Sequence, residues 1–346
     1  MASIEKNRIR AILKKGVFFF GLMALIGAII LTGPTSAFSQ SSKKITLRLS
    51  NGLAPTTFQN AVLLPEFASE IKAKTDGRVI VELYPAKELY GHIETAHAVH
   101  RGAVDMGLNS INHFVGYNPV TAFNDYAFLV KDVNSWHKDK IFPIMSDVFA
   151  EIDVKLLSLV PYSDTTIVST KLIEKPDDVK GLRIRGISDP FFDCIKAWGG
   201  VPAAMSPSEA FDALAKGALD GIMTGWESTE KRKFYDVADY IIGPTASPMF
   251  AIIMNMGVWN RLPQDVQKII QDAANKASDK GIAGQTGVDQ KAREVLKKKM
   301  KSVKVFKPED IPVWKKATLP AYDMYIQRCT KDGKGELAKK ILQIYQ

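Results

Sequence analysis

Two arginines, Arg183 and Arg185, stand close together in the segment GLRIRGISDP, which has the pattern of a core strand. Side chains alternate between the two faces of a strand, so both arginines lie on one face and Leu182 and Ile184 on the other. A guanidinium group binds a carboxylate through two parallel hydrogen bonds, and open α/β sheets bind ligands where their strands end. Each arginine is therefore either half of a surface ion pair or a ligand contact. For Arg183 we expect the ion pair, whereas for Arg185 the segment leaves both open.

Three histidines, His92, His97 and His100, lie in the segment HIETAHAVH. His97 and His100 are one helical turn apart with Glu94 nearby, so a metal site in a secreted metal-dependent enzyme is one alternative. No cysteine or second acidic ligand is close in the sequence, and a polar helix face explains the same residues. We therefore expect no metal, no cofactor and no catalytic residue in this segment.

Motifs typical of catalytic sites are absent from the sequence. The chain has no G-x-G-x-x-G, no G-x-x-x-x-G-K-[ST], no G-x-S-x-G and no H-E-x-x-H. Cys194 and Cys329 are its only cysteines, and their spacing is compatible both with one disulfide and with two free thiols. A binding protein that is not an enzyme is the simplest interpretation.

The first 39 residues differ from the rest of the chain. A basic start is followed by the apolar run GVFFFGLMALIGAIILTG and by small residues, which is typical of a secretory signal peptide cleaved after Ala37 or Ser39. The alternative is an uncleaved membrane anchor, because about 18 apolar residues can just span a bilayer. Cleavage removes five basic residues and one acidic residue, which lowers the net charge from +9 to +5 and places the mature chain in the periplasm. The modest charge, and the lack of interleaved aromatic residues in the basic run KKKMKSVKVFK, argue against a nucleic-acid partner.

From Lys44 onward, short apolar runs alternate with amphipathic stretches. The pattern predicts strands at ITLRLS, RVIVELYP and AVDMGL, separated by helices at FQNAVLLPEFASEIKAKT and HIETAHAVHRG. A second unit has the strands LRIRG, VPAAM and ALDGIM and the helices DPFFDCIKAWGG and SPSEAFDALAKG. Ser206 and Glu209 form a capping box at the start of the last of these helices. This alternation favours an α/β fold with largely parallel sheets.

A short motif occurs in both units and joins a helix to a strand. It reads RGAVDMG at 101–107 and KGALDGI at 216–222. Two similar α/β units favour two lobes with a ligand cleft between them. The predicted ranges are 44–165 and about 247–290 for lobe I, and 166–246 and about 291–346 for lobe II.

A long polar helical stretch follows the second unit. It extends from Pro263 to about Lys301 and is interrupted by Gly281, Gly284 and Gly287. A helix of this length is long enough to cross both lobes.

The segment KPDDVKGLRIRGISDPFFDCIKAWGGVPAAMSPSEAFDALAKGALDG, residues 175–221, resembles the signature of the substrate-binding proteins of tripartite ATP-independent periplasmic (TRAP) transporters. That family has a DLKGLKIR strand, a helix, a G-x-x-P-x-x-x-x-x-x-E link and a helix ending in G-x-x-D-G. The resemblance extends back through FASEIKAKTDGRVIVELYPAKEL and forward to MNMGVWNRLPQDVQKII. It implies a two-lobed, periplasmic-binding-protein-like fold. It also implies that the protein captures a small organic acid and delivers it to the integral membrane subunits of a TRAP permease. A ligand sensor for a membrane receptor is an alternative that the sequence leaves open.

The resemblance implies roles for individual residues. The family's carboxylate-clamping arginine falls on Arg185, and Arg183 matches a position outside the clamp. Many relatives have a side-chain amide where this chain has Thr224, which puts a C4-dicarboxylate in doubt. Trp226 would either offer a flat apolar wall to an aromatic or branched acid or pack within its lobe. Further candidate ligand contacts follow predicted strands: Asn109 and Ser110, Thr56 and Thr57, and Asn255, which resembles a recurrent asparagine of the family.

Overall fold

The computed structural model describes residues 44–136 and 138–345. The predicted signal peptide, residues 1–39, lies outside the described residues. Among the residues that are described, no helix combines the length and the hydrophobicity that crossing a membrane requires.

Strands and helices alternate along most of the described chain. The strands are β1 (Ile45–Ser50), β2 (Val79–Tyr84), β3 (Met106–Ser110), β4 (Val154–Pro161), β5 (Thr165–Ser169), β6 (Arg183–Gly186), β7 (Val201–Ala204), β8 (Gly221–Gly225), β9 (Tyr240–Ala246), β10 (Met249–Asn255) and β11 (Ser302–Val305). The α-helices are α2 (Leu64–Lys74), α3 (His92–His100), α4 (Lys138–Ala150), α5 (Asp189–Ala197), α6 (Pro207–Ala215), α7 (Trp226–Lys231), α8 (Met256–Arg261), α9 (Gln264–Lys297), α10 (Asp310–Lys331) and α11 (Gly335–Tyr345). Shorter helical turns are η1 (Gln59–Leu63), η2 (Ile111–Phe114), η3 (Pro119–Asp125), η4 (Val133–Trp136), η5 (Pro176–Val179) and η6 (Phe234–Asp236).

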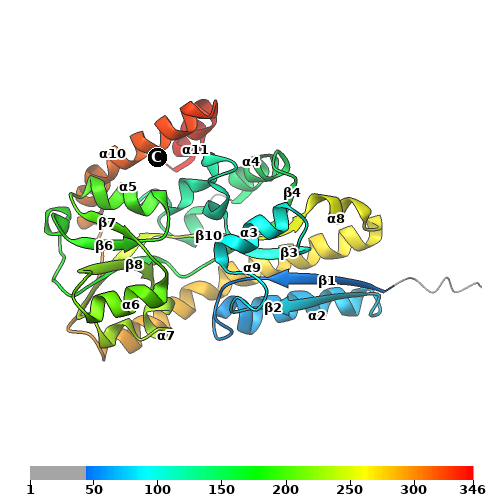
Figure 1. The fold of residues 1–346 in the computed structure, drawn as a ribbon, viewed down its shortest axis with the longest axis horizontal. Coiled ribbons are helices and arrows are strands. Elements are labelled where there is room, and N and C mark those ends of the chain that lie inside the picture. Colours follow the sequence, from blue (N-terminus) through cyan, green and yellow to red (C-terminus); the bar gives the residue numbers. More distant parts are fainter. Residues whose placement is uncertain (1–43, 137, 346) are drawn as a thin grey trace, which may run out of the picture. The chain divides into compact units, whose positions relative to one another are not determined.

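The strands form two separate sheets, which confirms the predicted two-lobed α/β fold. The sheet of lobe I has the order β2-β1-β3-β10-β4, and the sheet of lobe II has the order β11-β9-β5-β8-β6-β7. Figure 1 shows β1 to β3 and β6 to β8 as distinct sets of strands with their own helices. The strands of lobe I come from 45–161 and 249–255, and those of lobe II from 165–246 and 302–305. The residue at which each lobe begins and ends stays a prediction.

The sheets are largely parallel, as expected, but each contains one antiparallel strand, β10 in lobe I and β5 in lobe II. In lobe I, β1 is parallel to β2 and β3, but β10 is antiparallel to both β3 and β4. In lobe II, β5 is antiparallel to β8 and β9. The direction of β10 follows from the path of the chain. The chain leaves lobe I at the end of β4 and returns at the start of β10, so β10 enters the sheet at the edge where β3 ends and runs antiparallel to it.

The long helix α9 is continuous over Gln264–Lys297, so its glycines do not interrupt it. Instead, two of them allow close packing. A Cβ atom on Gly281 would lie 2.7 Å from the Cδ of Pro161, and one on Gly284 would lie 2.5 Å from the Cζ of Phe58. Figure 1 shows α9 running from the lobe I helices toward α7 of lobe II, as predicted for a helix that crosses both lobes.

Helix α10 packs against α5, and a buried polar network lies between them. The guanidinium of Arg328 donates from Nη2 to Asp193 Oδ2 at 3.0 Å and from Nη1 to the hydroxyl of Tyr126 at 2.9 Å. The Tyr126 hydroxyl in turn donates to Asp193 Oδ2 at 2.7 Å. Cys194 and Cys329 are buried in the same core as free thiols, so the described structure contains no disulfide between them.

Candidate functional site

A cavity of about 710 Å³ lies between the two sheets, at the edge where β1, β3, β6 and β8 end. Open α/β sheets bind their ligands at this edge. Its walls combine polar and apolar side chains, among them Ser110, Arg185, Phe191, Met205 and Phe250. Residues from both lobes contribute, as a site that closes around a ligand requires.

Arg185 is the buried cation of this cavity. It is the third residue of β6 and is only 3% exposed. Its Nε donates to the carbonyl oxygen of Met205 at 2.9 Å, and none of the described carboxylates forms an ion pair with it. Burial, and secondarily the nearby Arg232, lower the pKa of Arg185 to about 10. Because a buried charge without a counter-ion is costly, the site favours an anion that supplies the missing partner.

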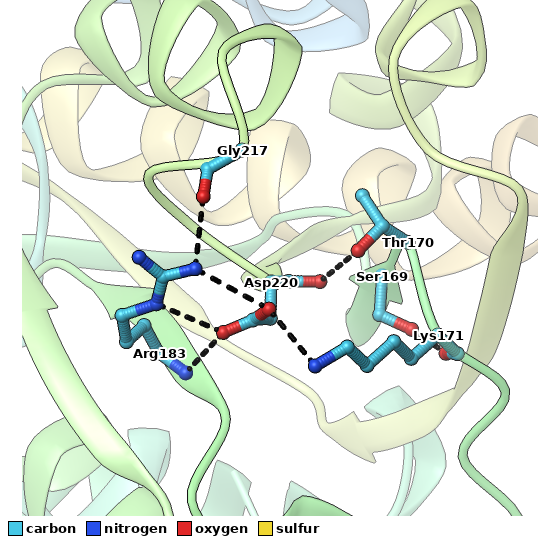
Figure 2. Close-up of polar contacts among 6 residues, drawn as sticks. All are labelled: Ser169, Thr170, Lys171, Arg183, Gly217 and Asp220. Atoms are coloured by element: carbon cyan, nitrogen blue, oxygen red, sulfur yellow. Dashed lines mark hydrogen bonds and ion pairs between the residues drawn. The ribbon is translucent and has the colours of Figure 1, made fainter.

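Arg183 lies two residues earlier on the same strand, at the edge away from the cavity, and the ion pair expected for it is confirmed. Figure 2 shows its guanidinium against Asp220, with Nε 3.0 Å from Oδ2. Its backbone N–H donates to the same oxygen, and Nη2 donates to the carbonyl of Gly217. Lys171 completes the set at 3.2 Å from Asp220 Oδ1. Arg183 therefore fixes the start of β8 and does not reach the ligand cavity.

Lobe I contains the same arrangement, at the other copy of the repeated motif. The backbone N–H of Arg48 donates to Asp105 Oδ2 at 2.8 Å, and its Nη2 donates to the carbonyl of Ala103 at 2.9 Å. Arg48 belongs to β1 and Asp105 directly precedes β3, just as Arg183 belongs to β6 and Asp220 directly precedes β8. The sequence similarity of 101–107 and 216–222 thus corresponds to a repeated structural element.

The Asp220 carboxylate should stabilise the fold in a pH-dependent way. Partial burial alone would raise its pKa, but hydrogen bonds from Arg183 and Lys171 outweigh this and lower it to about 2, below the usual 3.8. A lowered pKa adds stability above about pH 4, and this is lost as the pH falls toward 2. We expect Asp220→Asn to cost about 1–2 kcal/mol at pH 7 and progressively less below pH 4. Urea unfolding of the variant and of the unchanged protein, at pH 7 and below pH 4, measures this loss of stability. A loss that is the same at both would contradict the prediction.

Four of the predicted ligand contacts besides Arg185 line the cavity: Thr56, Thr57, Ser110 and Thr224. Thr57 Oγ1 donates to the carbonyl of Ala54, and the backbone carbonyl of Thr224 accepts from Thr166 Oγ1. The side-chain oxygen of Ser110 has no hydrogen-bond partner among the described residues. Thr56, Thr57 and Ser110 were predicted because each follows a predicted strand, and Thr224 because of its position in the family resemblance.

The other three predicted contacts do not line the cavity, and each requires a correction. Asn109 alternates with Ser110 along β3, so its amide points the other way and donates to the backbone carbonyl of His92. Trp226 is fully buried in the lobe II core, where Arg293 lies over its ring at 5.7 Å. Asn255 ends β10, and because β10 is antiparallel to β3 this end lies at the opposite edge of the sheet. There it caps α8 by accepting from the N–H of Val258.

The three clustered histidines have separate environments. His97 Nδ1 lies 2.6 Å from the Tyr117 hydroxyl, and His100 Nδ1 lies 2.9 Å from the carbonyl oxygen of Ile152. His92 instead lines the cavity. Within residues 44–136 and 138–345, no three histidine, cysteine, aspartate or glutamate side chains are placed to hold a metal ion. The metal-dependent enzyme considered from the sequence therefore has no support here.

The architecture and the cavity can be compared with known proteins. Residues 50–328 match the family model of the bacterial extracellular solute-binding proteins, family 7, also named DctP. This chain belongs to that family. Its members are receptors for solutes, which fits a protein without a catalytic role.

Family 7 relatives match the chain over most of its length. The C4-dicarboxylate-binding periplasmic protein DctP of Rhodobacter capsulatus is 27% identical over 319 residues, which is 89% of this chain and 94% of the relative. An uncharacterized protein of Haemophilus influenzae is 25% identical over 262 residues, which is 74% of this chain and 79% of the relative.

Solved structures of TRAP periplasmic solute-binding proteins have the same fold. One from Desulfovibrio salexigens, with bound orotic acid, has a TM-score of 0.80 at 22% identity and covers 87% of this chain and 99% of its own. One from Roseobacter denitrificans, with bound β-D-glucuronate, has a TM-score of 0.79 at 20% identity with the same coverage. Both confirm the two-lobed architecture expected from the family resemblance.

Two acidic residues of the cavity, Asp125 and Glu227, are not among the residues predicted from the sequence. Burial raises the pKa of each to about 7. Asp125 ends η3, in a segment for which the sequence pattern predicted no element. Glu227 follows Trp226 directly at the start of α7, and a signal was present: a charged residue in the first turn of a helix that begins where a cavity-forming strand ends.

Proposed function

We propose that this protein captures a small organic acid between its two lobes and delivers it to the integral membrane subunits of a TRAP-type permease. The observation that carries the proposal is Arg185, a buried guanidinium at the cavity with no carboxylate partner among the described residues. Membership in family 7 supports a receptor role, because the family is one of extracellular solute-binding proteins. The ligands named for the relatives described above, a C4-dicarboxylate, orotic acid and β-D-glucuronate, are all acids.

In this proposal the ligand carboxylate pairs with the guanidinium of Arg185. Ser110, Thr57 and Thr224 provide hydroxyl groups around it, and Phe191 contributes to the apolar wall. A bidentate, charge-assisted pair gives both affinity and orientation. The remaining volume accommodates the body of the acid.

Capture would proceed by closure of the lobes around the ligand. The chain crosses between the sheets at 161–165 and 246–249, and α9 also connects them. Among the hydrogen bonds that already join the lobes, the backbone N–H of Phe58 in lobe I donates to Glu227 Oε1 in lobe II at 3.2 Å. The short crossings are natural hinge positions, because they have to absorb only a few dihedral changes.

We also propose that the protein acts in the periplasm after removal of its first 37 or 39 residues. The basic start and apolar run of the sequence support this. The mass of the mature protein, purified from the periplasm of an expressing cell, measures the cleavage site. A full-length protein retained in the membrane would contradict it.

The organic-acid proposal is tested by thermal unfolding of the mature chain with a panel of dicarboxylates, keto acids, sugar acids and aromatic acids. A ligand at about a hundred times its Kd stabilises the fold by about 2.7 kcal/mol, so the unfolding temperature should rise by several degrees. We expect this rise with one class of acid and none with the corresponding amides. No rise with any acid would contradict the proposal.

A further inference from the structure

Three residues of the cavity wall each carry a buried polar atom without a hydrogen-bond partner among the described residues. The atoms are His92 Nδ1, Ser110 Oγ and Glu227 Oε2. His92 and Ser110 belong to lobe I and Glu227 to lobe II, so the three atoms come from both sides of the cavity. Buried polar groups in folded proteins are rarely left unpaired, and a cavity residue that carries one is a candidate for pairing with a ligand.

Glu227 is the best defined of the three. It is 3% exposed, and its backbone N–H donates to Ser163 Oγ at 2.9 Å. Its Oε1 accepts the N–H of Phe58, which fixes the carboxyl group from the opposite lobe and leaves Oε2 unpaired. Trp226 beside it points into the core, so the turn into α7 directs Glu227 toward the cavity. Oε2 is covered in this conformation, so a ligand group contacts it only if the Glu227 side chain, which forms part of the wall, rotates.

The three groups share a chemical property: each can both donate and accept a hydrogen bond. Ser110 offers a hydroxyl. Burial, followed by the charges of Arg232 and Lys87, lowers the pKa of His92 to about 4, so its imidazole is neutral at pH 7. Burial raises the pKa of Glu227 to about 7, although the hydrogen bond from Phe58 opposes this, so both of its protonation states are populated.

A hydroxyl group on the ligand fits all three, because it also donates and accepts and pairs with Glu227 in either protonation state. A second carboxylate on the ligand pairs with Glu227 only while that residue is protonated and is repelled by it when ionised. An alkyl chain leaves the three polar atoms unpaired. Sites with buried polar groups discriminate strongly against analogues that lack the matching group.

We infer that Glu227 is a specificity-determining residue that, with Ser110 and His92, selects hydroxylated organic acids over acids without a hydroxyl group. The inference rests on the proposed function, in which Arg185 holds the carboxylate. It adds a second recognition element, which contacts the body of the ligand rather than its carboxylate.

Calorimetric titration of the mature chain with matched acids tests this. The probes are D-gluconate against hexanoate and mandelate against phenylacetate, because the members of each pair differ only in hydroxyl groups. For a pair that binds, we expect the hydroxylated acid to bind at least about tenfold tighter, and Glu227→Leu to reduce this ratio to about threefold or less. Glu227→Gln should retain most of the ratio, because an amide also donates and accepts.

Glu230→Leu is the matched control, since Glu230 lies on the same short helix but does not line the cavity. It should leave the ratio unchanged. Equal affinities within a pair, or a ratio that survives Glu227→Leu, would overturn the inference while acid binding itself stands. If none of the probes and no acid in the thermal-unfolding panel binds, the proposed function fails and this inference fails with it.

Discussion

Replacing Arg185 with alanine should weaken organic-acid binding by about 100-fold or more. The guanidinium is buried at the cavity, and its Nη atoms have no carboxylate partner among the described residues. Each charge-assisted hydrogen bond contributes about 1.5–3 kcal/mol, and a bidentate pair makes two of them. Titration calorimetry of the variant with the acid identified by thermal unfolding measures the loss. Arg185→Lys should have an intermediate affinity, because lysine keeps the positive charge but cannot form the two parallel hydrogen bonds of a guanidinium.

Arg183→Ala is the matched control, with the same substitution two residues earlier on the same strand. Arg183 pairs with Asp220 away from the cavity, so its loss should lower the unfolding temperature and leave the affinity within about threefold. Equal losses of affinity from both substitutions would mean that the arginine facing the ligand has been assigned wrongly. An unchanged affinity in Arg185→Ala would mean that the carboxylate binds elsewhere.

Replacing Arg328 with leucine should reduce the free energy of unfolding by about 3–5 kcal/mol. Arg328 is the positive partner of Asp193, whose side chain is only 6% exposed. Removing one member of a buried pair leaves the other charge unpaired, and that penalty is larger than the net gain from the pair itself. Of the hydrogen bonds to the Asp193 carboxylate among the described residues, the one from the hydroxyl of Tyr126 remains. Urea unfolding at pH 7 measures the change.

Two further variants make this result specific. Lys331→Leu changes an exposed residue near the end of the same helix and should cost about 0.5 kcal/mol or less. The double variant Arg328→Leu/Asp193→Leu removes both charges and should recover much of the loss, as buried pairs replaced by apolar residues commonly do. A loss below 1 kcal/mol in Arg328→Leu would show that Asp193 finds another partner.

Local chemistry allowed a good part of this structure to be predicted. Ser206 and Glu209 form the expected capping box, and α6 begins directly after Ser206. The ion pair of Arg183 also agrees with the expectation from the segment itself, whereas the placement of Arg185 at the cavity was expected only from the family resemblance. Such features depend on neighbouring residues, and the sequence contains all the information that they need.

The predictions for Asn109, Trp226 and Asn255 failed for a different reason. At these positions the direction of a side chain depends on the exact residue at which an element begins or ends, or on the direction of a strand. Asn109 and Ser110 alternate because β3 continues through both, although the pattern predicted its end at residue 108. At the turn into α7, Trp226 points to the core and Glu227 to the cavity. Neighbouring helix positions differ by a rotation of about 100°, so an error of one residue exchanges the two directions. The direction of β10, and with it the place of Asn255, depends on which lobe the chain has just left.

The position of β10 also has a consequence for how the protein folds. This strand lies between β3 and β4, so β4 has no neighbour in its sheet until β10 is in place. The register pairs Phe250 with both Ser110 and Val160, residues far earlier in the chain. Closing such distant pairs is entropically slow. As the chain emerges from the ribosome, the sheet of lobe I therefore cannot be completed until residue 255 is available. A polypeptide whose sheet stays incomplete for so long during synthesis is well suited to transport across a membrane in an unfolded state.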